Sequence, residues 1–121
     1  RDLIIFEGTA STDRLVQLYS RSAIAIVPSV YEGFGFPAAE AMACGVPVIA
    51  SDGGALPEVV GDAGIVVPAR DHEALADAIN RIIDDKAALK TMGKAGIKRV
   101  EEMFTWKGAV EQMVQIYKSM L

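Results

Sequence analysis

The chain has few of the residues that usually carry metal and thiol chemistry. Its 121 residues include one cysteine and one histidine. A single cysteine cannot form a disulfide within the chain, which fits a reducing compartment weakly. Cys44 is either a thiol nucleophile or a small buried packing residue, and its small apolar neighbours favour the second interpretation. His72 has no second histidine with which to bind a metal, and we expect it to be solvated in the first turn of a helix.

Long apolar runs and an excess of positive charge are also missing. No run approaches the ~18 apolar residues that a membrane-spanning helix needs. The net charge is −4 and the pI is about 4.9, which disfavours broad binding to nucleic acids. The densest basic group, Lys94, Lys98 and Arg99, is expected to be a solvated helix face. We expect a cytoplasmic location, with membrane association open only through parts outside this chain.

The remaining sequence predicts one α/β domain. Hydrophobic residues make up 51% of the chain, as expected of a protein with a core. Short apolar runs predict buried strands at residues 3–6, 23–27, 46–50 and 64–67. Amphipathic stretches predict helices at residues 12–21, 37–44, 56–60, 72–84, 87–103 and 106–121. This alternation predicts a Rossmann-like parallel sheet with helices on both faces, which binds ligands at the carboxyl ends of its strands.

A glycine-rich loop joins the second predicted strand to the following helix. Gly33 and Gly35 lack side chains, so a ligand can approach the backbone closely. The loop leads into a helix with Pro37 at its first position, and free N–H groups at a helix start favour an anion. A phosphate or diphosphate could be held there with no metal.

Two carboxylates flank this predicted anion site. Glu32 lies on the loop, and Glu40 is expected in the first turn of the helix. Carboxylates accept hydrogen bonds from sugar hydroxyls, so the arrangement suits a nucleoside diphosphate sugar. The other interpretation is an ordinary tight loop, with Glu40 complementing the helix dipole and Glu32 solvated. The segment is neither a Walker loop nor the three-glycine dinucleotide motif.

The same residues resemble a known family. Glu32 and Glu40, with seven residues between them, resemble the Glu-x7-Glu motif of the family 4, or group 1, retaining glycosyltransferases, which have the GT-B fold. The resemblance continues over the segments Pro28–Ser29, Glu40–Ala50, Gly53–Glu58 (with one residue more than the family's Gly-Gly-x-x-Glu turn) and Phe104–Trp106. It extends over essentially the whole chain.

The resemblance implies roles for individual residues. Glu32 would be the catalytic group beside the transferred sugar, acting by positioning and electrostatics more than as a nucleophile. Glu40 would bind the ribose hydroxyls. The backbone N–H groups that would meet the diphosphate or the sugar are those of Gly33, Phe34, Gly35 and Phe36. Weaker candidates for the border of the cleft are Ser29, Gly53 and Gly54. The nucleotide sugar is the substrate, and no metal or other cofactor is expected.

The resemblance is to only the later part of one of the two Rossmann-like domains of a GT-B enzyme. We therefore expect residues 1–121 to form a partial nucleotide-sugar-binding domain, with carboxyl-terminal helices over residues 71–121. The expected partners are a nucleotide sugar and an amino-terminal GT-B domain. The family's Arg and Lys that neutralise the diphosphate have no counterpart, since Arg14 and Arg21 are expected to be solvated helix residues.

The resemblance also raises a question about the sheet. In the family, two strands that this chain lacks separate the strand matching residues 3–6 from the next one. An apolar strand with unpaired edges is a liability in water. We hypothesise that the chain pairs its own strands directly, dimerises, or exchanges elements with a second copy.

Three functions follow from this sequence. The first is the donor-binding portion of a hexosyltransferase that uses a UDP-, GDP- or ADP-sugar. The second is a non-catalytic module that binds nucleotide sugars or assembles with a partner, and that is inactive alone. The third is a fragment of a GT-B nucleotide-sugar epimerase. The Glu-x7-Glu loop favours the first two.

Overall fold

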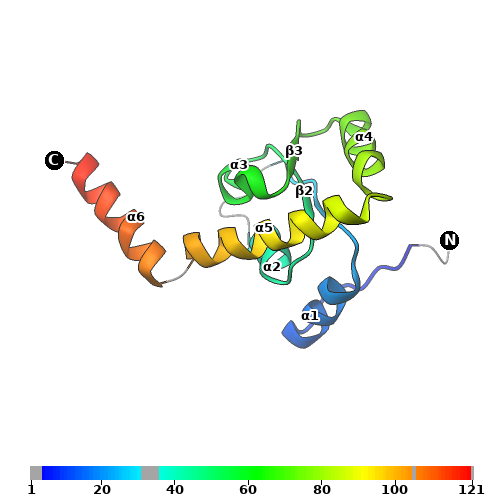
Figure 1. The fold of residues 1–121 in the computed structure, drawn as a ribbon, viewed down its shortest axis with the longest axis horizontal. Coiled ribbons are helices and arrows are strands. Elements are labelled where there is room, and N and C mark those ends of the chain that lie inside the picture. Colours follow the sequence, from blue (N-terminus) through cyan, green and yellow to red (C-terminus); the bar gives the residue numbers. More distant parts are fainter. Residues whose placement is uncertain (1–3, 31–35, 105, 121) are drawn as a thin grey trace.

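The computed structural model describes residues 4–30, 36–104 and 106–120. The elements follow the predicted alternation of strands and helices (Figure 1). They are α1 (Thr12–Arg21), β1 (Ala25–Val27), α2 (Phe36–Ala43), β2 (Val48–Ser51), α3 (Leu56–Val60), the 3-10 turn η1 (Gly61–Ala63), β3 (Ile65–Val67), α4 (His72–Ile82), α5 (Lys86–Phe104) and α6 (Trp106–Ser119). The described sheet is parallel, with the order β1-β2-β3.

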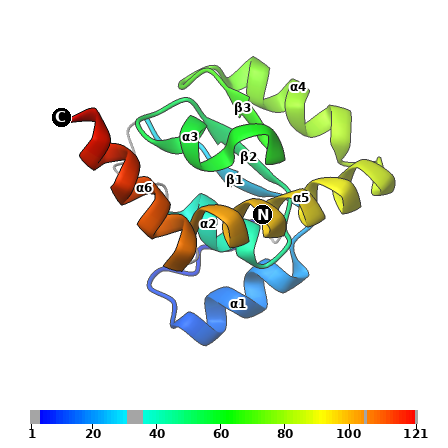
Figure 2. The same ribbon diagram turned by 60° about the vertical axis from the view of Figure 1, so that its left-hand side comes forward.

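Helices cover both faces of this sheet, as the sequence predicts. All four residues of the central strand β2 are buried. Val48 and Ala50 face a core built mainly from α2, α3 and η1. Ile49 points to the other face, where it packs with Val67 and with side chains of α4. Figure 2 shows α4 on one side of the strands and α2 and α3 on the other. Side chains of α5 pack against both clusters. The Rossmann-like fold class is therefore confirmed.

The helix ends explain why the chain turns where it does. Ser11 caps α1 by accepting a hydrogen bond from the N–H of Arg14, and Asp71 caps α4 in the same way. Gly45 follows α2 with φ of 76°, a left-handed conformation that glycine adopts without strain. The N–H groups of Gly45 and Val46 then bond back to the last turn of α2, which ends the helix in a Schellman motif.

The strand predicted at residues 3–6 is wrong for the residues that the structure describes. Ile4, Ile5 and Phe6 lie outside any strand and are 69%, 78% and 93% exposed, whereas Leu3 lies outside the described residues. A buried strand forms only beside a hydrogen-bonding neighbour, and no described strand pairs with this segment. Direct pairing is thus not the route that this segment takes, and dimerisation or exchange of elements stays a prediction.

The two long carboxyl-terminal helices, α5 and α6, differ in how they pack against the rest of the chain. α5 packs closely across α2, and a Cβ atom on its Gly93 would lie 2.4 Å from the carbonyl oxygen of Gly45. α6 extends from the end of α5, on the side away from α4 (Figures 1 and 2). Its described side chains, residues 113–120, are all exposed. Among the described residues, no helix combines the length and the apolar character needed to cross a membrane.

Candidate functional site

Two of the predicted cleft residues meet where β1 and β2 end. The two strands run side by side, with Val27 opposite Ala50, so the segments that follow them lie together. Gly53 is buried against the chain after β1, and a Cβ atom at this position would lie 2.5 Å from the carbonyl oxygens of both Ser29 and Val30. Only glycine allows so close an approach. Gly54 is exposed and has φ of 54°.

Ser51 also lies at the carboxyl ends of these strands, and its role was not predicted from the sequence. Its side chain is 3% exposed, and its hydroxyl donates a hydrogen bond to the carbonyl oxygen of Ser29. The Oγ atom also lies 3.5 Å from the carbonyl oxygen of Val27. A hydroxyl at the end of an otherwise apolar strand is the sequence feature that could have revealed this role. Ser51 and Gly53 together fix the backbone that leads into the glycine-rich loop.

Most residues of that loop lie outside the part of the chain that the structure describes. These residues are Glu32, Gly33, Phe34 and Gly35. Phe36 is described as the first residue of α2, one position before the start predicted at Pro37. The N-terminus of a helix therefore follows the glycine-rich segment directly, as predicted. Free N–H groups at such an end favour an anion.

Glu40 lies one residue further along α2 than predicted. Because α2 begins at Phe36, Glu40 starts the second turn of the helix, and the first turn contains no acidic residue. The carboxylate is exposed and accepts a hydrogen bond from the hydroxyl of Tyr19 on α1, with an O···O distance of 3.4 Å. Burial raises the pKa of Tyr19 above its ordinary value, and the negative charge of Glu40 raises it further.

The prediction that Cys44 is a buried packing residue is wrong. Its side chain is exposed, because the space beside it between α1 and α2 is left as an open cleft. It borders a cleft of about 270 Å³ between α1 and α2. The other residues that line this α1–α2 cleft are Thr12, Leu15, Val16, Tyr19, Glu40 and Ala43.

The basic residues behave as predicted except for Arg99. Lys94, Lys98 and Arg21 are exposed, and Arg14 forms an ion pair with Glu7. Arg99 is half-buried, and its Nε donates to the carbonyl oxygen of Val59 at 2.7 Å. The prediction of a solvated Arg99 is wrong because α5 crosses the end of α3, whose last carbonyl groups lack partners within their helix.

The part of the chain that the structure describes has no cluster of side chains suited to bind a metal ion. No group of three or more His, Cys, Asp or Glu side chains is arranged there to hold a metal ion. His72 is exposed at the start of α4, as predicted. It borders a cavity of about 240 Å³ on the α4 side of the same sheet edge, together with Pro28, Ser51 and Arg70.

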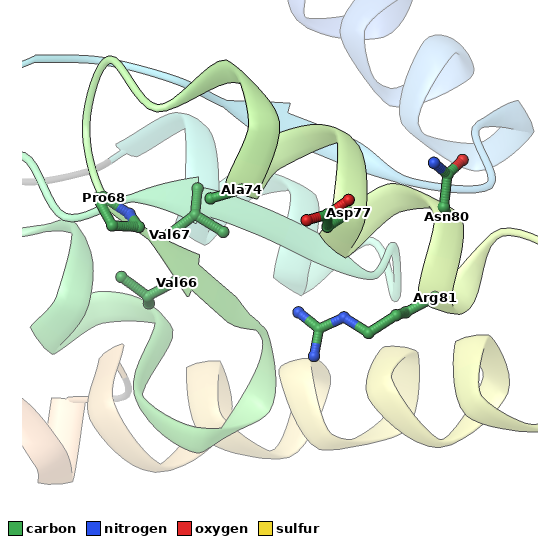
Figure 3. A pocket seen from close by; sticks show the side chains of 7 residues that line it. All are labelled: Val66, Val67, Pro68, Ala74, Asp77, Asn80 and Arg81. Atoms are coloured by element: carbon green, nitrogen blue, oxygen red, sulfur yellow. The ribbon is translucent and has the colours of Figure 1, made fainter.

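A wider groove of about 670 Å³ lies between β3 and α4 (Figure 3). Apolar side chains of β3 form one wall, and Asp77, Asn80 and Arg81 of α4 lie along the other (Figure 3). β3 pairs on one side only in the described sheet. Charged and polar side chains beside an open strand edge discourage pairing with other chains. We therefore interpret this groove as protection of the edge.

Comparison with known proteins identifies the family. The family model described as "Glycosyl transferases group 1" matches residues 1–99, which include the sheet, the glycine-rich loop, Glu32 and Glu40. The chain belongs to the group 1 glycosyltransferases. Similar curated proteins of this family include the MMP α-(1→4)-mannosyltransferase of Mycolicibacterium hassiacum, which is 39% identical over 97% of this chain. The alignment spans 29% of the length of that mannosyltransferase.

Solved structures agree with the assignment to group 1. Sucrose-phosphate synthase from Thermosynechococcus elongatus matches 98% of this chain with a TM-score of 0.82 and 43% identity. The match spans 30% of that synthase. Anabaena HepE, solved in complex with UDP-glucose, matches 87% of the chain with a TM-score of 0.72 and 26% identity. This group 1 glycosyltransferase chain thus spans about a third of the length of its relatives.

Proposed function

We propose that the chain is the donor-binding portion of a retaining glycosyltransferase that transfers a hexose from a nucleoside diphosphate sugar. The observation that carries the proposal is the arrangement of the backbone at the carboxyl ends of β1 and β2. There Ser51 and Gly53 hold the backbone of Ser29 and Val30, directly before the glycine-rich segment that leads into α2. Membership of the family and the UDP-glucose complex of a similar protein support the same function.

Each part of the donor has a proposed partner. The backbone N–H groups of residues 33–36 hold the diphosphate at the start of α2, where the helix dipole replaces a metal ion. Glu40 accepts hydrogen bonds from the ribose hydroxyls. Glu32 lies beside the transferred sugar and stabilises positive charge that develops on the ring.

The proposed reaction retains the configuration at the sugar carbon. The bond between this carbon and the diphosphate oxygen breaks, and the acceptor oxygen bonds to the carbon on the same face. The departing diphosphate takes the proton of the acceptor hydroxyl. An amino-terminal GT-B domain supplies the acceptor site and further positive charge, in keeping with relatives about three times as long as this chain.

Calorimetric titration tests the donor site. The chain is titrated with UDP-, GDP- and ADP-glucose, alongside Glu40→Ala and the control Glu101→Ala, whose glutamate is exposed on α5. We expect one nucleotide sugar to bind, and Glu40→Ala to weaken that binding about 10- to 100-fold, because a charged acceptor is lost. Glu101→Ala should bind as the wild type does. No binding at millimolar ligand, or equal binding by Glu40→Ala, contradicts the proposal.

Activity needs a second experiment. The chain is assayed alone and after fusion to the whole part of the sucrose-phosphate synthase that precedes the segment it resembles. We expect transfer only by the fused protein, and an α-linked product from an α-linked donor by NMR. A β-linked product would refute retention. Transfer by the chain alone would show that it needs no such partner.

A further inference from the structure

The α1–α2 cleft contains one hydrogen bond between functional groups of different helices. The hydroxyl of Tyr19 on α1 donates to Oε2 of Glu40 on α2, with an O···O distance of 3.4 Å. Among the hydrogen bonds of the described residues, this is the one that the Glu40 side chain accepts. Glu40 itself is exposed, so packing does not restrict its carboxylate to one rotamer. Among the described residues, Tyr19 is therefore the group that restricts this carboxylate.

Tyr19 is well placed to act as a rigid support. Its ring packs against the core formed by α2, β1 and β2, which fixes the ring while its hydroxyl reaches the cleft. The raised pKa of Tyr19 keeps this hydroxyl protonated, and so a donor, throughout the neutral range. A tyrosine loses little conformational entropy when it is held, because it has two side-chain torsions.

We propose that Tyr19 is a positioning residue that orients the Glu40 carboxylate toward the ribose hydroxyls of the donor. The proposal rests on the proposed function, since it assumes that Glu40 binds ribose. Tyr19 engages Oε2, and Oε1 remains for the nucleotide. A carboxylate held in one orientation before binding loses less entropy when the ligand arrives, which raises affinity without adding a contact.

The experiment removes the hydroxyl of Tyr19 and the hydroxyls of the ribose in turn. Wild type, Tyr19→Phe and Glu40→Gln are titrated with UDP, GDP and ADP and with the 2′,3′-dideoxy form of each. For the nucleotide that binds, we expect Tyr19→Phe to weaken binding about 3- to 10-fold. With the dideoxy form, wild type and Tyr19→Phe should bind equally, because no hydroxyl remains for Glu40 to accept from. Tyr117→Phe, at an exposed tyrosine of α6, is the matched control.

The outcomes separate this proposal from the proposed function. An equal loss with both forms of the nucleotide would show that Tyr19 acts through the fold, and would overturn the positioning role. So would unchanged affinity of Tyr19→Phe while Glu40→Gln weakens the ribonucleotide. If Glu40→Gln also binds like the wild type, or no nucleotide binds at all, the ribose role of Glu40 fails and this proposal fails with it. Thermal melting of Tyr19→Phe checks that the ring still packs.

Discussion

At the scale of single residues, one hydroxyl joins the two segments of the candidate site. Ser51 is buried at the end of β2 and donates to the carbonyl oxygen of Ser29 after β1. The carbonyl group of Ser29 is part-buried, so water replaces a lost donor there only incompletely. The geometry at the carboxyl ends of β1 and β2 therefore depends on Ser51, a residue with no part in the proposed reaction.

We predict that Ser51→Ala lowers the free energy of unfolding by about 1 kcal/mol, because it removes the hydrogen bond to the part-buried carbonyl group of Ser29. Ser29→Ala is the control, since it keeps the carbonyl oxygen that accepts the bond, and its effect should stay within about 0.5 kcal/mol. Urea unfolding followed by circular dichroism measures both. Equal destabilisation by the two variants would show that the hydroxyl of Ser51 has no special part.

Tyr19 gives the protein a stability that depends on pH. Its pKa is raised by burial and by Glu40. The folded state therefore keeps the proton at pH values where the unfolded state loses it. The contribution of this group is fully present below the ordinary pKa of about 10, and is lost as the pH rises through the folded pKa.

We predict that the free energy of unfolding falls more steeply above pH ~10 in the wild type than in Tyr19→Phe, which has no proton to lose at this position. Urea unfolding at several pH values between neutral and alkaline measures the difference. Tyr117→Phe, at an exposed tyrosine, should follow the wild type. Parallel curves for wild type and Tyr19→Phe would contradict the assignment.

At the scale of elements, glycines allow α5 to pack on α2. A Cβ atom on Gly93 would lie 2.4 Å from the carbonyl oxygen of Gly45, a contact with backbone that cannot move aside. A Cβ atom on Gly96 would lie 3.3 Å from the Cβ of Met42, which a small shift of the helices relieves. Glycine inside a helix otherwise costs about 1 kcal/mol relative to alanine.

We predict that Gly93→Ala lowers the free energy of unfolding by about 1–3 kcal/mol, because overpacking outweighs the gain in helix propensity. Gly96→Ala, in the same helix, should change it by less than about 1 kcal/mol. Thermal and urea unfolding measure both variants. A more stable Gly93→Ala would mean that α5 does not approach α2 this closely.

At the scale of the whole molecule, exposed apolar side chains are grouped in two stretches of the described residues. Ile4, Ile5 and Phe6 form one of them. The other is α6, whose exposed apolar residues are Met113, Val114, Ile116, Tyr117 and Met120. Exposed apolar residues grouped in this way mark surfaces that a partner or further chain covers.

We predict that the chain binds the apolar dye anilinonaphthalene sulfonate, and that the triple variant Met113→Gln, Ile116→Gln and Met120→Gln lowers the dye fluorescence. The melting temperature should change little, since these side chains are exposed and pack on no described core. Gln115→Asn is the control on the same helix. Unchanged fluorescence of the triple variant would place the dye elsewhere.

Local patterns decided much of the fold. Hydrophobic periodicity predicted the helices α1 and α4, and in the structure Ser11 and Asp71 cap them. Apolar runs predicted β1, β2 and β3, because parallel strands that are covered on both faces need apolar residues throughout. The family was predicted from the resemblance of the segment around Glu32 and Glu40 to the Glu-x7-Glu motif, and the family model that matches residues 1–99 confirms it.

By itself, the sequence determined the order of the elements from α1 onward and the strands β1, β2 and β3, since these follow from local propensity and periodicity. Its resemblance to the group 1 glycosyltransferases identified the family. Only the tertiary structure decided that residues 4–6 are not a strand and that Cys44 is exposed. It alone also brought Ser51 to Ser29, and Tyr19 to Glu40. Each of these depends on which segments become neighbours in space. Contacts between segments far apart in the chain leave no periodic pattern in the sequence.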